Sequence, residues 1–175
     1  RLTWSEIPLQ TDTGIWAYIG GRILDGAHPY RDLWESKPPG IFYTFALVER
    51  LFGIGRDGPL LWLDALVSGA VLATTYAVAR RFTSRVAAAA AVFLLSAIFC
   101  HRVLADWGDN VEKFVALFEM LACYLLMRSW SSPARPRTWW TAGISCGLAA
   151  MFKQTGILFL LVATLAMVCS GIFRR

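Results

Sequence analysis

Acidic and basic residues gather in residues 11–40 of a chain that is otherwise strongly apolar. Asp12 and Lys37 stand near the two ends of this stretch, and Arg22 and Arg31 lie between them. Transfer of a group away from a phosphate needs a base beside the acceptor and a cation beside the leaving phosphate. A carboxylate and an ammonium group suit these two tasks, and a guanidinium group holds phosphate oxygens in a bidentate way. We therefore expect chemistry in this stretch.

Each of these side chains also has a simpler explanation. Asp12 can cap or complement the N-terminus of a helix. Lys37 can anchor the chain at lipid headgroups, and Arg22 and Arg31 can make surface or lipid contacts. The residue types alone leave both interpretations open.

A second group of acids lies further along the chain. Asp109, Glu112 and Glu119 share one face of a predicted helix, because they are spaced at i, i+3 and i+10. An ionisable group such as Glu119 is costly within a membrane unless it lines a cavity or has a partner. The simpler alternative is that Asp109 or Asn110 caps the helix. Asp64, in the first long apolar run, is expected to be a structural partner for one of the cations.

The third signal is the sequence Phe-Lys-Gln-Thr-Gly at residues 152–156. The apolar run before it, residues 139–152, rises only about 21 Å as a helix and so stops short of the far membrane surface. Lys153 would then lie deep, where it either contacts a phosphate or pairs with Glu112 or Glu119. Alternatively, its side chain extends to the interface.

Apolar residues set the fold class. They make up 57% of the 175 residues and give a mean hydropathy of +0.51, which is typical of a polytopic membrane protein. We predict an all-α membrane bundle with about five spans, at residues 58–80, 86–104, 111–127, 139–152 and 156–173. The cysteines have no metal-ligand or redox spacing and are predicted to be small apolar fillers.

An apolar segment at residues 41–52 is too short to cross a membrane, because about 12 residues make a helix of about 18 Å against a hydrocarbon core of about 30 Å. If it lies in the interface, the arginine-rich loops all fall on one side, which the positive-inside rule makes cytoplasmic. Their arginines are Arg80, Arg81, Arg85, Arg128, Arg135, Arg137, Arg174 and Arg175. Residues 11–40 then lie outside the cytoplasm. The net charge of +5 reflects this orientation and gives no support to nucleic-acid binding.

Two regions follow from this topology: an extracytoplasmic or interfacial loop with juxtamembrane helices over residues 1–57, and an incomplete transmembrane bundle over residues 58–175. In the first region, Thr11 begins and Gly26 ends a predicted amphipathic helix, whose apolar face enters the headgroup region. This face consists of Ile15, Trp16, Ile19 and Ile23. Beyond the helix, three prolines predict a stiff, irregular loop that presents charges.

The order of features in residues 8–53 resembles a known family. An acid, an amphipathic helix ending in glycine, Pro-Tyr at residues 29–30, a charged loop, Lys-Pro-Pro at residues 37–39 and an aromatic-rich apolar helix follow one another. This set resembles the first extracytoplasmic loop of the GT-C superfamily of membrane glycosyltransferases, in particular the protein O-mannosyltransferase and aminoarabinose transferase group with their bacterial relatives. The resemblance continues more loosely through the hydrophobic helices.

The resemblance implies an inverting glycosyltransferase at the inner (plasma) membrane, which moves a sugar from a polyprenyl-phosphate carrier to an acceptor hydroxyl outside the cytoplasm. It implies that Asp12 acts as general base on the acceptor or orients it, and that Lys37 contacts the carrier phosphate. Tyr30, Arg22 and Arg31 would assist Lys37 in binding the substrate.

Glu35 belongs to the same predicted substrate-binding group. Relatives often place a glutamate directly before the lysine, whereas Ser36 intervenes here. The role that the resemblance would give to this glutamate is therefore in doubt at this position.

The later motifs also have counterparts in the family. Many members carry a second acid in a short loop, which implies that Asp109, followed by Glu112, contacts the acceptor or a metal. Similar lysine turns imply a substrate contact for Lys153. The implied partners are the lipid-linked donor, membrane lipid and an acceptor glycan, lipid or protein; a divalent cation is the one cofactor left open. GT-C enzymes usually have a helix before this loop and several more after it, so we expect parts to be missing at both ends.

The main alternative is a polytopic transporter, in which Glu119 and Lys153 mark a pathway through the membrane centre. Most charges lie on the predicted outer side, and no matched pair of broken helices is apparent, which favours the enzyme. A nonenzymatic membrane scaffold would leave the pattern from Asp12 to Lys37 unexplained.

Overall fold

The structure is a computed structural model, and it describes residues 11–100, 111–130 and 136–169. This part of the chain is helical and contains no β-strand, which confirms the predicted all-α class. The helices are α1 (Thr11–Leu24), α2 (Gly40–Phe52), α3 (Asp57–Ala79), α4 (Arg85–Cys100), α5 (Val111–Trp130), α6 (Pro136–Phe152) and α7 (Gly156–Cys169).

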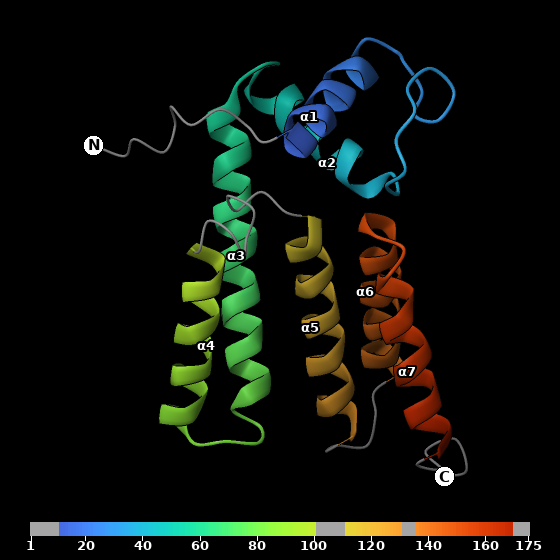
Figure 1. The fold of residues 1–175 in the computed structure, drawn as a ribbon. Coiled ribbons are helices and arrows are strands. Elements are labelled where there is room, and N and C mark those ends of the chain that lie inside the picture. Colours follow the sequence, from blue (N-terminus) through green and yellow to red (C-terminus); the bar gives the residue numbers. More distant parts are fainter. Residues whose placement is uncertain (1–10, 101–110, 131–135, 170–175) are drawn as a thin grey trace.

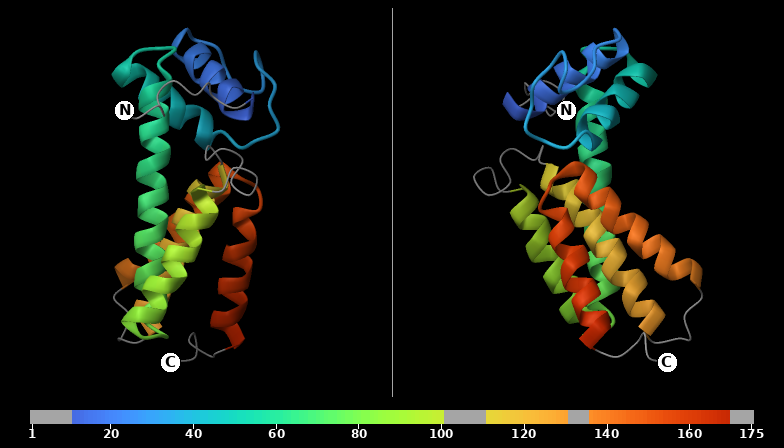
Figure 2. Two further views of the ribbon diagram at one scale, coloured as in Figure 1. Left: turned by 60° about the vertical axis from the view of Figure 1, so that its left-hand side comes forward. Right: turned by 90° about the vertical axis from the view of Figure 1, so that its right-hand side faces the viewer.

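The helices form a bundle with a cap at one end. Figure 1 shows α1, α2 and the loop between them together at one end, while α3 to α7 run between that end and the other in alternating directions. The two further views in Figure 2 keep the cap at the same end of the bundle. Within the bundle, α5 packs against both α3 and α6. We call the end that carries α1, α2 and their loop the polar end.

The helix that best fits a membrane span is α3. Among the described residues it alone is both long and apolar enough to cross a membrane, and α4 and α7 contribute shorter apolar helices. The twenty residues of α5 carry charged side chains near both ends and at Glu119, which lowers the mean hydropathy of this helix. Large apolar side chains on the outer faces of the bundle are exposed, as a lipid-facing surface requires. They include Leu66, Phe93, Leu161 and Val162.

Arginines mark the opposite end of the bundle. The α3–α4 turn carries Arg80 and Arg81, and Arg128 and Arg137 lie where α5 ends and α6 begins. The α3–α4 turn, the C-terminus of α5 and the N-terminus of α6 lie at the end away from α1 and α2 (Figure 1). The described part of the chain thus has the predicted separation between residues 11–40 and the arginine loops. Arg135, Arg174 and Arg175 lie outside the described residues.

The apolar face of α1 packs on protein, which corrects the expectation that it enters lipid headgroups. Trp16 and Ile19 are each only 3% exposed, and the Trp16 ring meets Phe45 of α2 edge-on at a centroid distance of 6.4 Å. Only Ile15 remains exposed on this face, and Ile23 is half-buried. A stripe of apolar residues on a helix has the same pattern whether it faces lipid or another helix, and here α2 supplies the partner.

Two glycines explain how α1 fits its surroundings. A Cβ added to Gly20 would lie 2.9 Å from the backbone nitrogen of Ala46, so α1 and α2 approach closely only because this residue has no side chain. At the C-terminus of α1, Gly26 has φ +93°. The amides of Gly26 and Ala27 donate to the carbonyls of Ile23 and Arg22, the two hydrogen bonds of a Schellman motif. Gly26 therefore ends α1, as predicted.

Candidate functional site

A buried ion pair joins α3 to α5 near the polar end. The Lys113 ammonium lies 2.9 and 2.7 Å from the two carboxylate oxygens of Asp64, and the side chains are only 6% and 12% exposed. The ammonium also lies 5.3 Å from the centre of the Phe99 ring, a cation–π contact. Asp64 thus has a cationic partner, as predicted, but this partner is Lys113 and not one of the cations of the predicted site.

The identity of that cation was missed from sequence. No motif in the sequence singles out Lys113, although an acid inside an apolar span requires a partner within the membrane. The chain has three lysines, at positions 37, 113 and 153. Of these three, Lys113 lies in the first turn of a long, largely apolar helix, which can pack along α3. This position was the feature of the sequence that could have identified Lys113 as the partner of Asp64.

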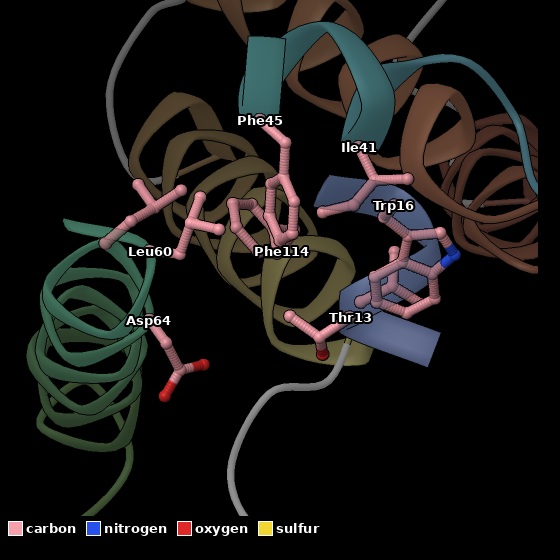
Figure 3. Close-up of a pocket in the computed structure, with 9 residues that line it drawn as sticks. Thr13, Trp16, Ile41, Phe45, Leu60, Asp64 and Phe114 are labelled. Carbon is pink, nitrogen blue, oxygen red and sulfur yellow. The ribbon is translucent and has the colours of Figure 1, made fainter. Parts of the chain in front are cut away.

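Asp64 also lines a small pocket that four helices form. The lining residues are Thr13, Trp16, Ile41, Phe45, Leu60, Leu63, Asp64, Val111 and Phe114. Figure 3 shows them converging from α1, α2, α3 and α5, with the Asp64 carboxylate as the charged group among aromatic and aliphatic side chains. Thr13 is fully buried at this pocket, whereas its neighbour Asp12 is exposed in the first turn of α1. Asp12 thus lies beside the pocket, where a base could meet an acceptor from outside.

Tyr30 organises the loop between α1 and α2. It is the only non-glycine residue with a left-handed backbone in the described part, at φ 68°. Its amide donates to the Leu33 carbonyl at 2.7 Å, and its hydroxyl donates to the Lys37 carbonyl at 2.6 Å. The ring packs near Phe42 at a centroid distance of 6.2 Å. Burial, with a smaller contribution from the nearby Glu35, raises the pKa of Tyr30, so the phenol keeps the proton that it donates.

The predicted guanidinium contacts are engaged with carboxylates of their own segment. Arg31 forms two hydrogen bonds to Asp32, at 2.9 and 2.8 Å. The hydrogen bond from Arg31 lowers the pKa of Asp32, and the same bond raises the pKa of Arg31. Arg22 pairs with Asp25 at 3.1 Å on the surface, in a separate hollow between α1 and the α2–α3 connection. A phosphate would have to compete with these carboxylates for either arginine.

Glu35 also serves its own loop. One of its oxygens accepts hydrogen bonds from the Ser36 amide at 2.7 Å and from the Ser36 hydroxyl at 3.0 Å. Its carboxylate therefore closes a local turn directly before Lys37. Ser36, which separates Glu35 from Lys37, supplies both donors of this turn.

The turn between α6 and α7 contacts the loop between α1 and α2, although the two segments are far apart in the sequence. Lys153 pairs with Glu112 at the start of α5, so of the two acids considered for it the structure selects Glu112 and not Glu119. Lys153 therefore lies at the polar end, beside the first turn of α5. The next residue, Gln154, donates from its side-chain amide to the Ser36 carbonyl at 2.8 Å.

The end of α6 is packed tightly beneath this turn. A Cβ added to Gly40, the first residue of α2, would lie 2.5 Å from the Met151 carbonyl oxygen, so the two helix ends touch through backbone. Phe152 stacks on Phe114 and Phe118 of α5, with centroid distances of 4.8 and 5.6 Å. These contacts fix where Lys153 and Gln154 leave the bundle.

The structure therefore gathers most of the predicted site at the polar end. The Lys37 loop touches the turn that carries Lys153, and Glu112 is paired there. Thr13, the neighbour of Asp12, lines the pocket that also contains Asp64, whereas Arg22 faces a different hollow. Asp109, predicted to contact the acceptor or a cation, lies outside the described residues, and within them no three His, Cys, Asp or Glu side chains group to hold a metal ion.

A helical bundle with apolar outer faces, capped at one end by paired charges, is the arrangement of a membrane protein. A family model described as dolichyl-phosphate-mannose-protein mannosyltransferase matches residues 36–175, which is well over half of the chain. The chain belongs to this family of GT-C-like membrane glycosyltransferases. The match includes Lys37, Glu112 and Lys153, and it begins beyond Asp12. Comparison with curated proteins and with solved structures found no match.

Proposed function

We propose that the chain forms the donor site of an inverting glycosyltransferase that moves a sugar from polyprenyl phosphate to an acceptor hydroxyl. The observation that carries this proposal is the hydrogen bond from Gln154 to the Ser36 carbonyl. It joins two segments that are far apart in the sequence, and each presents a lysine as the neighbouring residue. Lys37 and Lys153 are therefore candidates to hold one phosphate between them.

This pairing of lysines suits the leaving group. Negative charge grows on the carrier phosphate as the glycosidic bond breaks, and preorganised cations stabilise it electrostatically. Lys153 is held by Glu112 with its side chain still 26% exposed, so a phosphate can reach it from outside. Both lysines lie where the backbone is restrained: Lys37 precedes two prolines, and Lys153 directly follows the end of α6.

Asp12 is the proposed general base. Deprotonation of the acceptor by a positioned carboxylate typically contributes about 10² to 10⁴ in rate. Thr13 follows Asp12 directly, Ile41 follows the Lys-Pro-Pro sequence after one further residue, and both line the same pocket. This shared pocket supports the proposal that the base and the phosphate contact serve one site.

The donor and the sidedness are parts of the same proposal. The family description supports mannose on a polyprenyl phosphate as the first donor to assay, with a protein, glycan or lipid as acceptor. The arginines at the opposite end of the bundle support an extracytoplasmic polar end at the plasma membrane. A membrane-impermeant thiol reagent should then label Ser36→Cys and not Thr83→Cys in intact cells; the reverse pattern would refute this orientation.

Transfer by membranes that contain the protein tests the catalytic assignment. With polyprenyl-phosphate mannose as donor, Asp12→Asn should lower the rate of sugar transfer by about 10² or more, because the amide cannot accept the acceptor proton. Asp25→Asn is the matched control, since Asp25 is also an exposed aspartate at an end of α1. Equal rates for the two variants would remove Asp12 from the mechanism.

A further inference from the structure

Two consecutive carbonyls, those of Ser36 and Lys37, each accept a hydrogen bond from a side chain elsewhere in the structure. The Gln154 amide donates to the first at 2.8 Å, and the Tyr30 hydroxyl donates to the second at 2.6 Å. The next two residues are prolines, whose rings fix φ. The backbone on both sides of the Lys37 side chain is therefore restrained.

The two donors are themselves held in place. Gln154 follows Lys153, which is paired with Glu112, and both leave an α6 end that is pressed against Gly40. Tyr30 keeps a strained left-handed backbone, which persists only where the surroundings hold it. Its amide, hydroxyl and ring all have partners. Each donor is thus a fixed point to which the loop is attached.

Around Lys37 the side chains of the loop are only partly covered by the rest of the protein. Trp34 is 84% exposed, Ser36 is exposed and Lys37 is only half-buried. The packing of α2 on α6 comes instead from Gly40 against Met151, and that of α5 on α6 from the phenylalanine stack. Loss of the Gln154 hydrogen bond should therefore move the Lys37 backbone without unfolding the helices.

We propose that Gln154 is a positioning residue for Lys37, with Tyr30 as the second donor of the same clamp. The clamp holds the lysine backbone in place before the substrate binds, so that less conformational entropy is lost when its ammonium meets a phosphate. This inference rests on the proposed function, because it takes Lys37 to be a contact of the carrier phosphate.

A double-mutant cycle on the purified full chain tests the inference, with the affinity for polyprenyl phosphate as the readout. Gln154→Met keeps the length of the side chain and removes the donor. It should weaken binding about fivefold, which is the effect of one hydrogen bond. In a Lys37→Ala background, the same substitution should have no further effect. Thr155→Ala, an exposed position in the same turn, is the matched control and should bind like the unaltered protein.

Different results would overturn the positioning role of Gln154 and the proposed function. Equal affinities for Gln154→Met and Thr155→Ala would overturn the inference, and so would an equal loss in both backgrounds, because Gln154 would then act independently of Lys37. Unchanged binding by Lys37→Ala would instead overturn the proposed phosphate contact itself. If Gln154→Met does not fold, the same cycle with Tyr30→Phe decides, and unchanged affinity in Tyr30→Phe would overturn the clamp.

Discussion

The two ends of the bundle both carry cations, but they hold them differently. At the polar end, four cations each lie beside a carboxylate; these pairs are Arg22–Asp25, Arg31–Asp32, Lys113–Asp64 and Lys153–Glu112. At the other end, Arg80 donates to the Thr83 carbonyl at 2.6 Å and Arg81 lies over the Tyr124 ring at 5.4 Å. The α3–α4 turn that contains them has no acid.

This difference suggests separate roles for the two ends: the arginine end suits contact with lipid headgroups, and the polar end suits binding of a substrate phosphate. Arginines without acidic neighbours suit anionic lipid headgroups, which attract them and so orient the protein. Cations beside carboxylates are held in defined positions, and the carboxylates can in turn act as bases. The polar end is therefore where a bound phosphate would meet a preorganised site.

The buried pair at the polar end should show the largest effect. Lys113→Met alone leaves the Asp64 carboxylate buried without its partner, which typically costs about 3–5 kcal/mol of unfolding free energy. The double variant Lys113→Met with Asp64→Leu should recover most of that stability, because apolar residues of similar size commonly replace such pairs without loss. Thermal unfolding in detergent measures both. A single variant as stable as the double one would show that the pair has no structural role.

This pair also marks the limit of what the sequence predicts. The helices were located from the lengths of apolar runs, because those lengths are local; α2, α3 and α7 begin within a residue of the predicted positions. The partner of Asp64 lies 49 residues away, and no local pattern specifies it. The same holds for the buried face of α1 and for the bond from Gln154 to Ser36, which depend on how helices pack and not on which residues form them.

The ion pair between Lys153 and Glu112 should affect substrate binding more than folding. Lys153→Ala should weaken the affinity for polyprenyl phosphate about tenfold, since it removes a charged donor. Glu112→Gln should leave the affinity unchanged or raise it, because the carboxylate competes with the phosphate for Lys153. Binding of a fluorescent polyprenyl phosphate measures both variants. If Glu112→Gln loses as much affinity as Lys153→Ala, the pair acts as a structural unit and not as a phosphate contact.

The smallest effect is expected at Glu49, which is buried in α2 against α1. Burial raises the pKa of Glu49 above its ordinary value of 4.5, so the folded protein holds this proton more tightly than the unfolded chain does. Its contribution to stability is therefore present at acid pH and is lost as the pH rises above that value. The pKa of Asp32 is lowered, so its contribution changes only below pH 4 and does not interfere.

Melting temperatures at pH 5 and pH 8 test this prediction. The unaltered protein should melt at a lower temperature at pH 8 than at pH 5, because the contribution of Glu49 is lost as the pH rises. Glu49→Gln should lose this difference, whereas the control Asp57→Asn should retain it. A difference that persists in Glu49→Gln would assign the pH dependence to another group.

The contrast between the two ends is tested most directly by finding where the carrier phosphate binds. A polyprenyl phosphate with a photoreactive diazirine in its first isoprene unit can be cross-linked to the full chain in membranes, and the labelled peptides identified by mass spectrometry. We predict labelling of the loop that contains Lys37 and of the α6–α7 turn that contains Lys153, with competition by unlabelled polyprenyl phosphate. Competed labelling confined to the arginine turn between α3 and α4 would contradict the account.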